Sequence, residues 1–113
     1  MKAIVAYIQP FMLEKVTDAL RSKQVHGVTV IQCQGFGRRV DGKEPHYEDT
    51  NVELGYAPKA KVEIVCSERE MPAIVHAIRE SAHTGRHGDG KIFVTNVTLA
   101  VDIRTGSEGE AIL

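Results

Sequence analysis

Hydrophobic positions along the chain follow two different periods, and their succession predicts the order of the secondary-structure elements. Residues 2–8 are rich in Val, Ile and Tyr, which predicts a buried strand ended by Pro10. From Met12 to Lys23 apolar residues recur at helical spacing, and Gly27 marks the exit of that helix. Residues 28–36 alternate with a period of two, as expected for a second strand. The first third is therefore expected to fold as strand, helix and strand.

The second half of the chain repeats this succession. Residues 59–66 predict a third strand, and residues 71–78 carry an amphipathic helical stripe that begins near Met71, with Pro72 in its first turn. A last strand region is expected from Lys91 to Arg104, interrupted near Asn96. Beyond the interruption, alternate apolar residues share one face: Val97, Leu99, Val101 and Ile103. The order predicts an α+β, ferredoxin-like βαββαβ sandwich, with two helices on one face of an antiparallel sheet.

Length and composition indicate one soluble domain spanning residues 1–113. The chain has 14 basic and 15 acidic residues, so it lacks the basic excess of a nucleic-acid-binding domain. Neither a membrane-spanning apolar run nor a signal-peptide pattern is present, so we expect a cytoplasmic protein that is not inserted in a membrane. Cys33 and Cys66 lie in strand-like segments and are expected to be buried free thiols.

The segment from Thr84 to Val94 is a glycine-rich, basic loop that runs directly into a strand. Arg86 and Lys91 supply positive charge, which favours an anionic ligand such as a phosphate. A P-loop is excluded, because Ile92 stands where Ser or Thr would bind magnesium and the loop follows a helix. Backbone can approach a ligand closely at three positions that lack a Cβ atom: Gly85, Gly88 and Gly90. Asp89 lies in a Gly-Asp-Gly turn, where its first role is expected to be capping the amides of its own loop.

A long connection, residues 37–57, separates the second and third strands and has little apolar periodicity. Connections of this length are uncommon in compact domains and are usually functional or disordered. This one carries charges of both signs together with Tyr47 and Tyr56. We therefore favour an arm that contacts a partner over a solvated hairpin without one.

Several short segments, spread from one end of the chain to the other, occur together in the order of a known family. They are Lys2-Ala3-Ile4, Gln9-Pro10-Phe11, Gly27-Val28-Thr29-Val30, Gly35-Phe36-Gly37-Arg38, Pro58 to Ile64, Thr84-Gly85, Gly88 to Val94, and Ile103 to Gly106. In these segments the chain resembles the PII signal-transduction family of nitrogen and carbon regulators. The resemblance implies a ferredoxin-like homotrimer that binds ATP or ADP in clefts between subunits and is not an enzyme.

The resemblance also implies a role for each loop. Residues 37–57 match the T-loop that meets partner proteins, residues 83–91 the phosphate-holding B-loop, and residues 102–113 the C-loop of a neighbouring subunit. The base of the T-loop is Gly35, Phe36, Gly37 and Arg38. Positions around the nucleoside are Thr29, Glu63 and Val65; phosphate contacts are Arg38, Lys91 and Arg104, with Thr84, Gly88, Asp89 and Gly90 in the B-loop. Lys59 matches the lysine that binds the carboxylate effector 2-oxoglutarate.

Three positions depart from the family pattern. Arg39 stands where nitrogen-sensing members carry a magnesium-binding glutamine, and a guanidinium offers only donors, which argues against sensing of 2-oxoglutarate through Mg²⁺-ATP. The uridylylated tyrosine aligns with about Val52, so modification there is not expected. Asp102 accompanies Arg104 where the family often has two arginines. A carboxylate repels a phosphate tail, so we expect weaker ATP binding and relatively better ADP or AMP binding.

These departures indicate a divergent member, of the type associated with bicarbonate transport and carboxysomes or with metal-efflux transporters. We expect a second effector such as bicarbonate or another small anion near Arg38, Arg39 and Lys59, and a membrane transporter as the T-loop partner. Three alternatives remain open. They are a conventional 2-oxoglutarate and ATP-sensing nitrogen regulator, a phosphate-handling enzyme using Asp89 and His87, and a trimer that binds metal through histidines and carboxylates.

Overall fold

The computed structural model describes residues 1–25, 27–36 and 56–113. Four strands and two α-helices follow one another in the predicted order, with a 3-10 turn before the first helix and another at the C-terminus. They are β1 (Lys2–Ile8), η1 (Pro10–Met12), α1 (Leu13–Ser22), β2 (Thr29–Gly35), β3 (Ala57–Cys66), α2 (Met71–Ala82), β4 (Gly90–Asn96) and η2 (Glu110–Ile112). Residues 37–55 of the predicted T-loop, and His26, lie outside the described residues.

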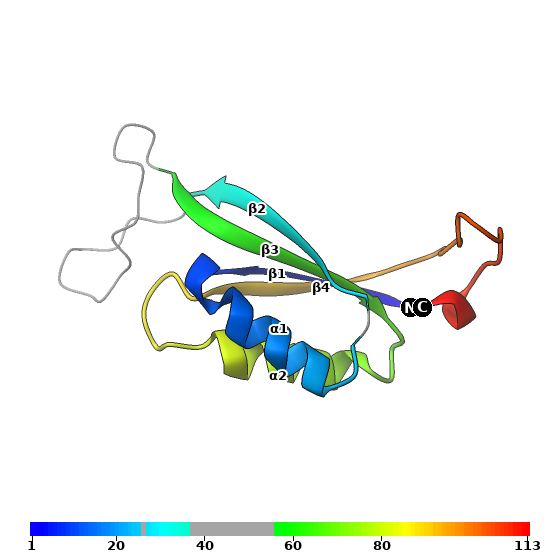
Figure 1. Cartoon of the computed structure of the whole chain (residues 1–113), viewed down its shortest axis with the longest axis horizontal. Coiled ribbons are helices and arrows are strands. Elements are labelled where there is room, and N and C mark those ends of the chain that lie inside the picture. The colour runs from blue at the N-terminus through cyan, green and yellow to red at the C-terminus, as the bar shows by residue number, and fades with distance from the viewer. Residues whose placement is uncertain (26, 37–55) are drawn as a thin grey trace.

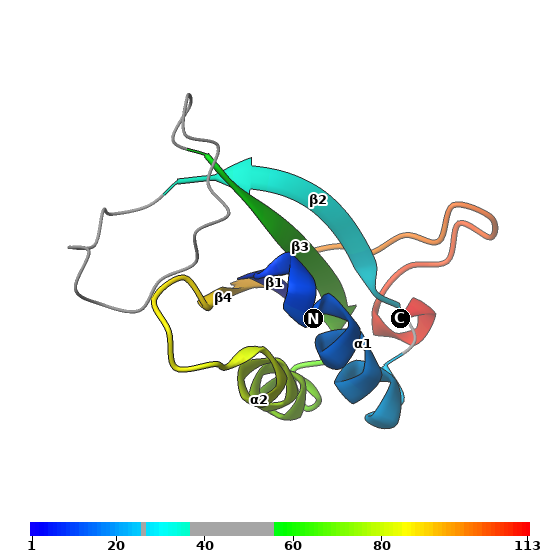
Figure 2. The same cartoon turned by 60° about the vertical axis from the view of Figure 1, so that its left-hand side comes forward.

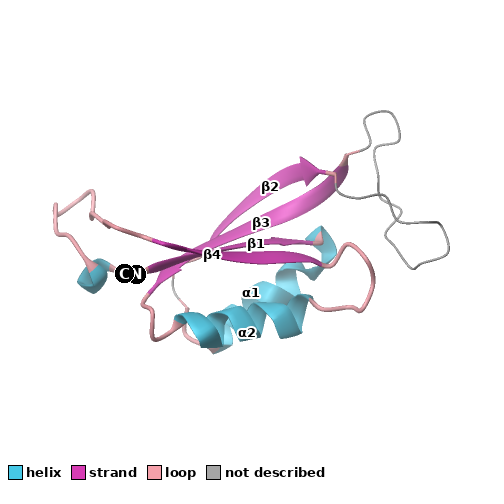
Figure 3. Ribbon diagram, turned by 180° about the vertical axis from the view of Figure 1, so that it is seen from behind, coloured by secondary structure: helices cyan, strands magenta, loops and turns pink. Residues whose placement is uncertain are grey.

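The strands form one antiparallel sheet in the order β2-β3-β1-β4. Both helices lie side by side on the same face of this sheet, as two views show (Figure 1 and Figure 2). The opposite face carries no helix among the described residues, which is also visible from behind (Figure 3). This arrangement confirms the predicted α+β, ferredoxin-like fold.

The core lies between the sheet and the helices, and strand alternation selects its members. From Ile4 in β1 and from Ala60 in β3, every second residue points toward the helices and is almost completely buried, while its neighbours face the open side. The helices contribute the apolar stripes predicted from their spacing. The largest fully buried side chains are Ile4, Ile8, Val16, Leu20, Val62 and Ile78. Each is worth about 1.5–3 kcal/mol of burial free energy.

The start of α2 follows the prediction in detail. The helix begins at Met71, and Pro72 lies in its first turn, where a missing N–H costs no hydrogen bond. The Ser67 hydroxyl accepts the Glu70 N–H at 3.1 Å, which is one half of a capping box. That bond belongs to the turn before the helix, so the capping spacing and the proline do not compete.

The exit of α1 comes earlier than the glycine at position 27 suggested. Gln24 has a positive φ of 61°, and its N–H donates to the Arg21 carbonyl at 2.9 Å. The Val25 N–H donates to the Leu20 carbonyl at 3.1 Å. These two bonds form a Schellman motif, with glutamine in the left-handed position that usually holds glycine.

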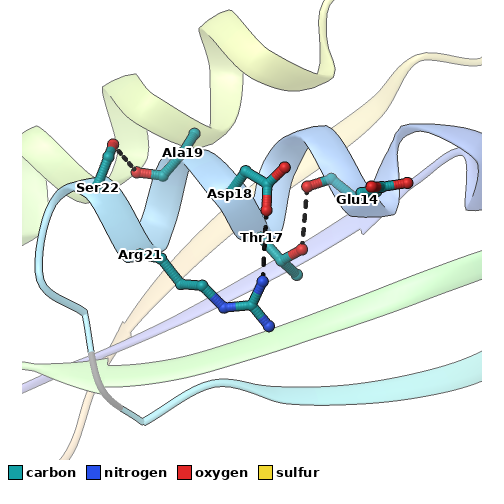
Figure 4. A network of polar contacts seen from close by, with 6 residues as sticks. All are labelled: Glu14, Thr17, Asp18, Ala19, Arg21 and Ser22. Carbon is teal, nitrogen blue, oxygen red and sulfur yellow. Dashed lines mark hydrogen bonds and ion pairs between the residues drawn. The ribbon is translucent and has the colours of Figure 1, made fainter.

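The solvent-facing surface of α1 is stabilised locally (Figure 4). The hydroxyls of Thr17 and Ser22 donate to carbonyls three residues earlier, at 3.0 and 2.7 Å, and Arg21 pairs with Asp18 at 3.4 Å. The ion pair is exposed and contributes at most a few tenths of a kcal/mol. The helix surface therefore needs no partner to explain its polar residues.

The C-terminal segment departs from the prediction. The last strand ends at Asn96, as its predicted interruption suggested, but residues 97–104 do not continue the sheet. Val101 forms only an isolated antiparallel bridge with Glu108, and Leu99 and Ile103 are exposed. The prediction of a strand at residues 97–103 was thus wrong. This part of the chain runs beyond the end of β1, and among the described residues it has no strand beside it to pair with.

Cys66 is buried, as predicted, and burial raises the pKa of its thiol. Cys33 is only partly buried, which corrects the prediction for this residue. It lies on β2, an edge strand, where one side of the ladder and much of the side-chain surface face solvent. Among the described residues no helix is long and apolar enough to cross a membrane.

Candidate functional site

The glycine loop, residues 83–89, joins α2 to β4 and is closed by one carboxylate. Asp89 accepts the Thr84 N–H at 2.8 Å and the Gly85 N–H at 3.0 Å, and it also accepts the Thr84 hydroxyl. The Thr84 oxygen in turn accepts the Arg86 N–H at 3.2 Å. The capping role predicted for Asp89 is therefore confirmed, and the shape of the loop is built from its own polar groups.

Gly90 allows the loop to enter the sheet. This residue has a φ of +114°, and a Cβ atom built on it would lie 1.7 Å from the Tyr7 carbonyl oxygen and 2.8 Å from its carbon. Any other residue would collide with the backbone of β1. Gly90 and Lys91 are the first residues of β4, so the irregular part of the predicted B-loop ends at residue 89.

The Gly88 carbonyl connects the loop to two other segments. The Gln9 side-chain amide, at the end of β1, donates to this oxygen, and Gln9 is only 6% exposed. The Lys59 ammonium group, on β3, donates to the same oxygen at 3.4 Å. Sequence reasoning missed Gln9; the one available signal was a polar residue directly after a buried strand.

Lysines gather on the open face of the sheet beside the loop. Tyr7 of β1 is directly opposite Lys61 on one side and Lys91 on the other, and opposed residues share a face. Partial burial lowers the pKa of the Lys59 ammonium group, and Cys33, opposite it in β2, opposes that shift. A partly dehydrated cation beside a glycine loop favours an anionic ligand.

Two aromatic pairs border this region. Tyr7 and Phe93 form an edge-to-face pair on the open face, with ring centroids 6.3 Å apart. Phe36 and Tyr56 form a second one, at 5.3 Å, where the predicted T-loop leaves and re-enters the sheet. Of the predicted T-loop base, Gly35 and Phe36 are described at this end of the sheet, whereas Gly37 and Arg38 lie outside the described residues, as does Arg39.

An apolar pocket of about 380 Å³ lies behind the loop, on the helix-covered side of the sheet. Aliphatic residues from α2, β1 and β4 form its walls, and Arg79 and His83 line it as well. Within the described parts of the chain, no group of three or more His, Cys, Asp or Glu residues is placed to hold a metal ion. Three of the predicted ligand residues, Asp89, Gly90 and Lys91, also line this pocket.

Comparison with known proteins agrees with the geometry. The family model described as nitrogen regulatory protein P-II matches residues 1–107. The chain belongs to the PII family. Relatives named nitrogen regulatory protein P-II, from Rhizobium meliloti and Azospirillum brasilense, are 44% and 43% identical over 109 residues, covering 96% of each chain. A protein named nitrogen regulatory protein P-II 2, from Methanothermobacter thermautotrophicus, is 42% identical over 110 residues, or 97% of this chain and 95% of that protein.

PII proteins are regulatory signalling proteins without catalytic activity, and this PII chain is not an enzyme. The phosphate-handling enzyme considered from the sequence is therefore set aside. The local geometry agrees, because the carboxylate that such chemistry would have used, Asp89, is bonded to the amides of its own loop.

Within one chain of this PII protein, the remaining predicted ligand residues lie away from the glycine loop. Thr29, the first residue of the edge strand β2, is directly opposite Glu63 of β3, and Glu63 pairs with Lys61 at 2.8 Å. This bond raises the pKa of the Lys61 ammonium group. Val65 is two residues further along β3 and is 43% exposed.

Arg104 lies at the opposite end of the sheet from the glycine loop. The segment 97–113 projects beyond the end of β4, whereas residues 83–89 project beyond its start (Figure 1 and Figure 3). The five residues of strand after Lys91 span about 17 Å, so the two predicted phosphate contacts of one chain do not meet. Asp102, beside Arg104, is used locally: its carboxylate accepts the Thr105 N–H at 2.9 Å.

Proposed function

We propose that this PII protein senses adenine nucleotides, ADP or AMP in preference to ATP, in clefts between the subunits of a homotrimer. The observation that carries this proposal is the separation of Lys91 from Arg104. If both residues contact one polyphosphate, as the family resemblance implies, they must come from two different chains. Nucleotide binding would then report on the assembled protein and not on a single subunit.

The placement of the two groups favours a ring. One group lies at the loop end of the sheet (Lys59, the glycine loop and Lys91), and Arg104 lies beyond the other end. A head-to-tail contact places the loop end of one chain against the far end of the next, and repeated contacts of this kind can close as a ring. The open face offers apolar surface for such a contact: Tyr7, Ile31, Val65 and Phe93 are each at least 36% exposed.

A second, anionic effector is part of the proposal. Within the described part of the chain, the ammonium group of Lys59 donates to a carbonyl oxygen at 3.4 Å, and its lowered pKa reflects partial loss of hydration. A small anion such as bicarbonate would offer this ammonium group a stronger, charge-assisted partner. Arg38 and Arg39 would add charge from outside the described residues. With Arg39 in place of an amide ligand, magnesium is not required in this arrangement.

The output would pass through residues 37–57, the family's T-loop, to a partner protein in the cytoplasm, for which we propose a membrane transporter. The ligand would act by favouring one of two states of that arm, in proportion to its different affinities for them. Nitrogen regulation through 2-oxoglutarate and ATP is the second candidate. It is favoured by the names of the relatives and by the retained Lys59.

Calorimetric titration distinguishes the two candidates. Purified protein is titrated with ADP, AMP and Mg²⁺-ATP, each alone, with bicarbonate and with 2-oxoglutarate, while light scattering gives the mass of the assembly. The proposal expects a trimer and ADP or AMP binding that responds to bicarbonate and not to 2-oxoglutarate. Mg²⁺-ATP binding strengthened by 2-oxoglutarate would replace it with the conventional nitrogen sensor, and a monomer that binds nucleotide would refute the intersubunit site.

A further inference from the structure

Gln9 is a buried polar residue whose side chain is committed to the glycine loop. It follows the last residue of β1 and precedes Pro10, and its own carbonyl accepts the Met12 N–H at 2.9 Å in the 3-10 turn. Its position is therefore held by the strand before it and by the turn after it. From there the side-chain amide reaches the Gly88 carbonyl, 79 residues away in sequence.

Among the described residues, two side chains donate to the Gly88 oxygen, and they differ in charge and in burial. Gln9 is neutral and 6% exposed, so the donor end of its bond is shielded from water, although Gly88 itself is exposed. Lys59 is charged and only partly buried, and its ammonium nitrogen is 3.4 Å from the Gly88 oxygen. Its hydrogen bond is therefore weaker, and the ammonium group can turn to another acceptor. If Lys59 moved to an anion, Gln9 would still satisfy the carbonyl.

Holding this carbonyl also sets the direction of the next peptide group. The carbonyl and the following N–H of a trans peptide point in opposite directions. Fixing Gly88 toward Gln9 therefore fixes the orientation at Asp89, the residue whose carboxylate closes the loop on Thr84 and Gly85. The path runs from Gln9 through Gly88 and Asp89 to the loop amides.

We propose that Gln9 is a positioning residue for the glycine loop, and that it leaves Lys59 available to an anionic ligand. The positioning role of Gln9 concerns the protein without any ligand. The effect on nucleotide affinity rests on the function proposed above.

The test compares Gln9→Met, which removes the donor at nearly constant volume, with Gln9→Lys, which restores a donor. Gln32→Met, an exposed glutamine on the edge strand β2, is the matched control. Amide hydrogen exchange is measured without ligand at Thr84 and Gly85, and at Val5 in the middle of β1. Calorimetry with ADP follows on the same proteins.

In Gln9→Met, exchange at Thr84 and Gly85 should rise about two- to tenfold, the range expected for one hydrogen bond, with Val5 unchanged. ADP affinity should fall by a similar factor, Gln9→Lys should restore both, and Gln32→Met should change neither. Lys59→Met combined with Gln9→Met should accelerate loop exchange by more than the product of the single effects, because the double variant removes both donors that the described residues offer to Gly88.

Unchanged loop exchange in Gln9→Met would overturn the proposal, as would an equal rise at Val5, which would mean a general loss of stability. Strictly multiplicative single effects would refute the shared acceptor. If the wild-type protein failed to bind ADP, the proposed function would fail, and the exchange rates would still decide the role of Gln9.

Discussion

Gly90 packs against Tyr7 so closely that a Cβ atom at position 90 would lie 1.7 Å from the Tyr7 carbonyl oxygen. The contact lies where the glycine loop enters the edge of the sheet, and it decides how the loop is placed relative to β1. A position selected by its lack of a side chain thus connects the core of the fold to the proposed ligand site.

Replacing Gly90 by alanine should therefore disturb both stability and binding. The side chain would force β4 away from β1 in a conformation with positive φ, and we expect the free energy of unfolding to fall by more than about 3 kcal/mol. Gly27→Ala is the matched control, because beyond its chain neighbours no heavy atom of the described residues lies within 4 Å of its Cβ position, and its φ is outside the left-handed region. Denaturant unfolding of both variants checks the prediction; a Gly90→Ala protein as stable as Gly27→Ala would contradict it.

Lys91→Ala should weaken ADP binding without unfolding the protein. A charge-assisted bond to phosphate is worth about 1.5–3 kcal/mol, which corresponds to a loss of roughly ten- to a hundredfold in affinity. Lys15→Ala, an exposed lysine of α1, removes the same charge at a distance from the loop and should leave affinity unchanged. Calorimetric titration with ADP compares the two variants. Equal losses of affinity would mean that net charge, and not a specific site, determines binding.

Gln24→Gly should stabilise the protein. A left-handed conformation costs a residue with a Cβ atom about 1 kcal/mol or more, and glycine adopts it freely while losing some chain entropy on folding. We expect a net gain of about 0.5–1 kcal/mol in thermal or denaturant unfolding. Lys23→Gly, at the neighbouring C-cap position with φ −90°, lacks this strain and should be neutral or destabilising. A loss of stability in Gln24→Gly would contradict the left-handed helix exit.

The turn of residues 102–105, which the Asp102 carboxylate closes, should weaken in acid. Hydrogen bonds donated by Thr105 hold the pKa of the Asp102 carboxyl below its usual value. A carboxyl with a lowered folded-state pKa stabilises the turn above the unfolded pKa, near 4, and this contribution is lost as pH falls through the folded value. The Thr105 amide resonance, followed by NMR between neutral pH and about pH 2, should report this loss. In Asp102→Asn the transition should be absent; its persistence would assign it to another group.

Local chemistry in the sequence was sufficient for most elements. The periods of apolar residues predicted the four sheet strands and both helices to within two residues at most boundaries, because buried faces repeat with the geometry of the backbone. Pro72 placed the start of α2, since a proline is tolerated only in the first turn. The turn around Asp89 was predictable because its partners, Thr84 and Gly85, are close in sequence.

What only the tertiary structure decided involves partners distant in sequence. Residues 97–103 alternate as a strand does, yet they pass the end of β1 and find no ladder to join. Gln9 and Gly88 meet only because β1 and β4 are neighbours, and Lys91 and Arg104 are separated because a strand of fixed rise lies between them. The sequence by itself determined which residues can be buried, which can form a turn and which can cap a helix or loop, because those properties depend on near neighbours. Which of them come together depended on strand order and register, which are properties of the whole sheet.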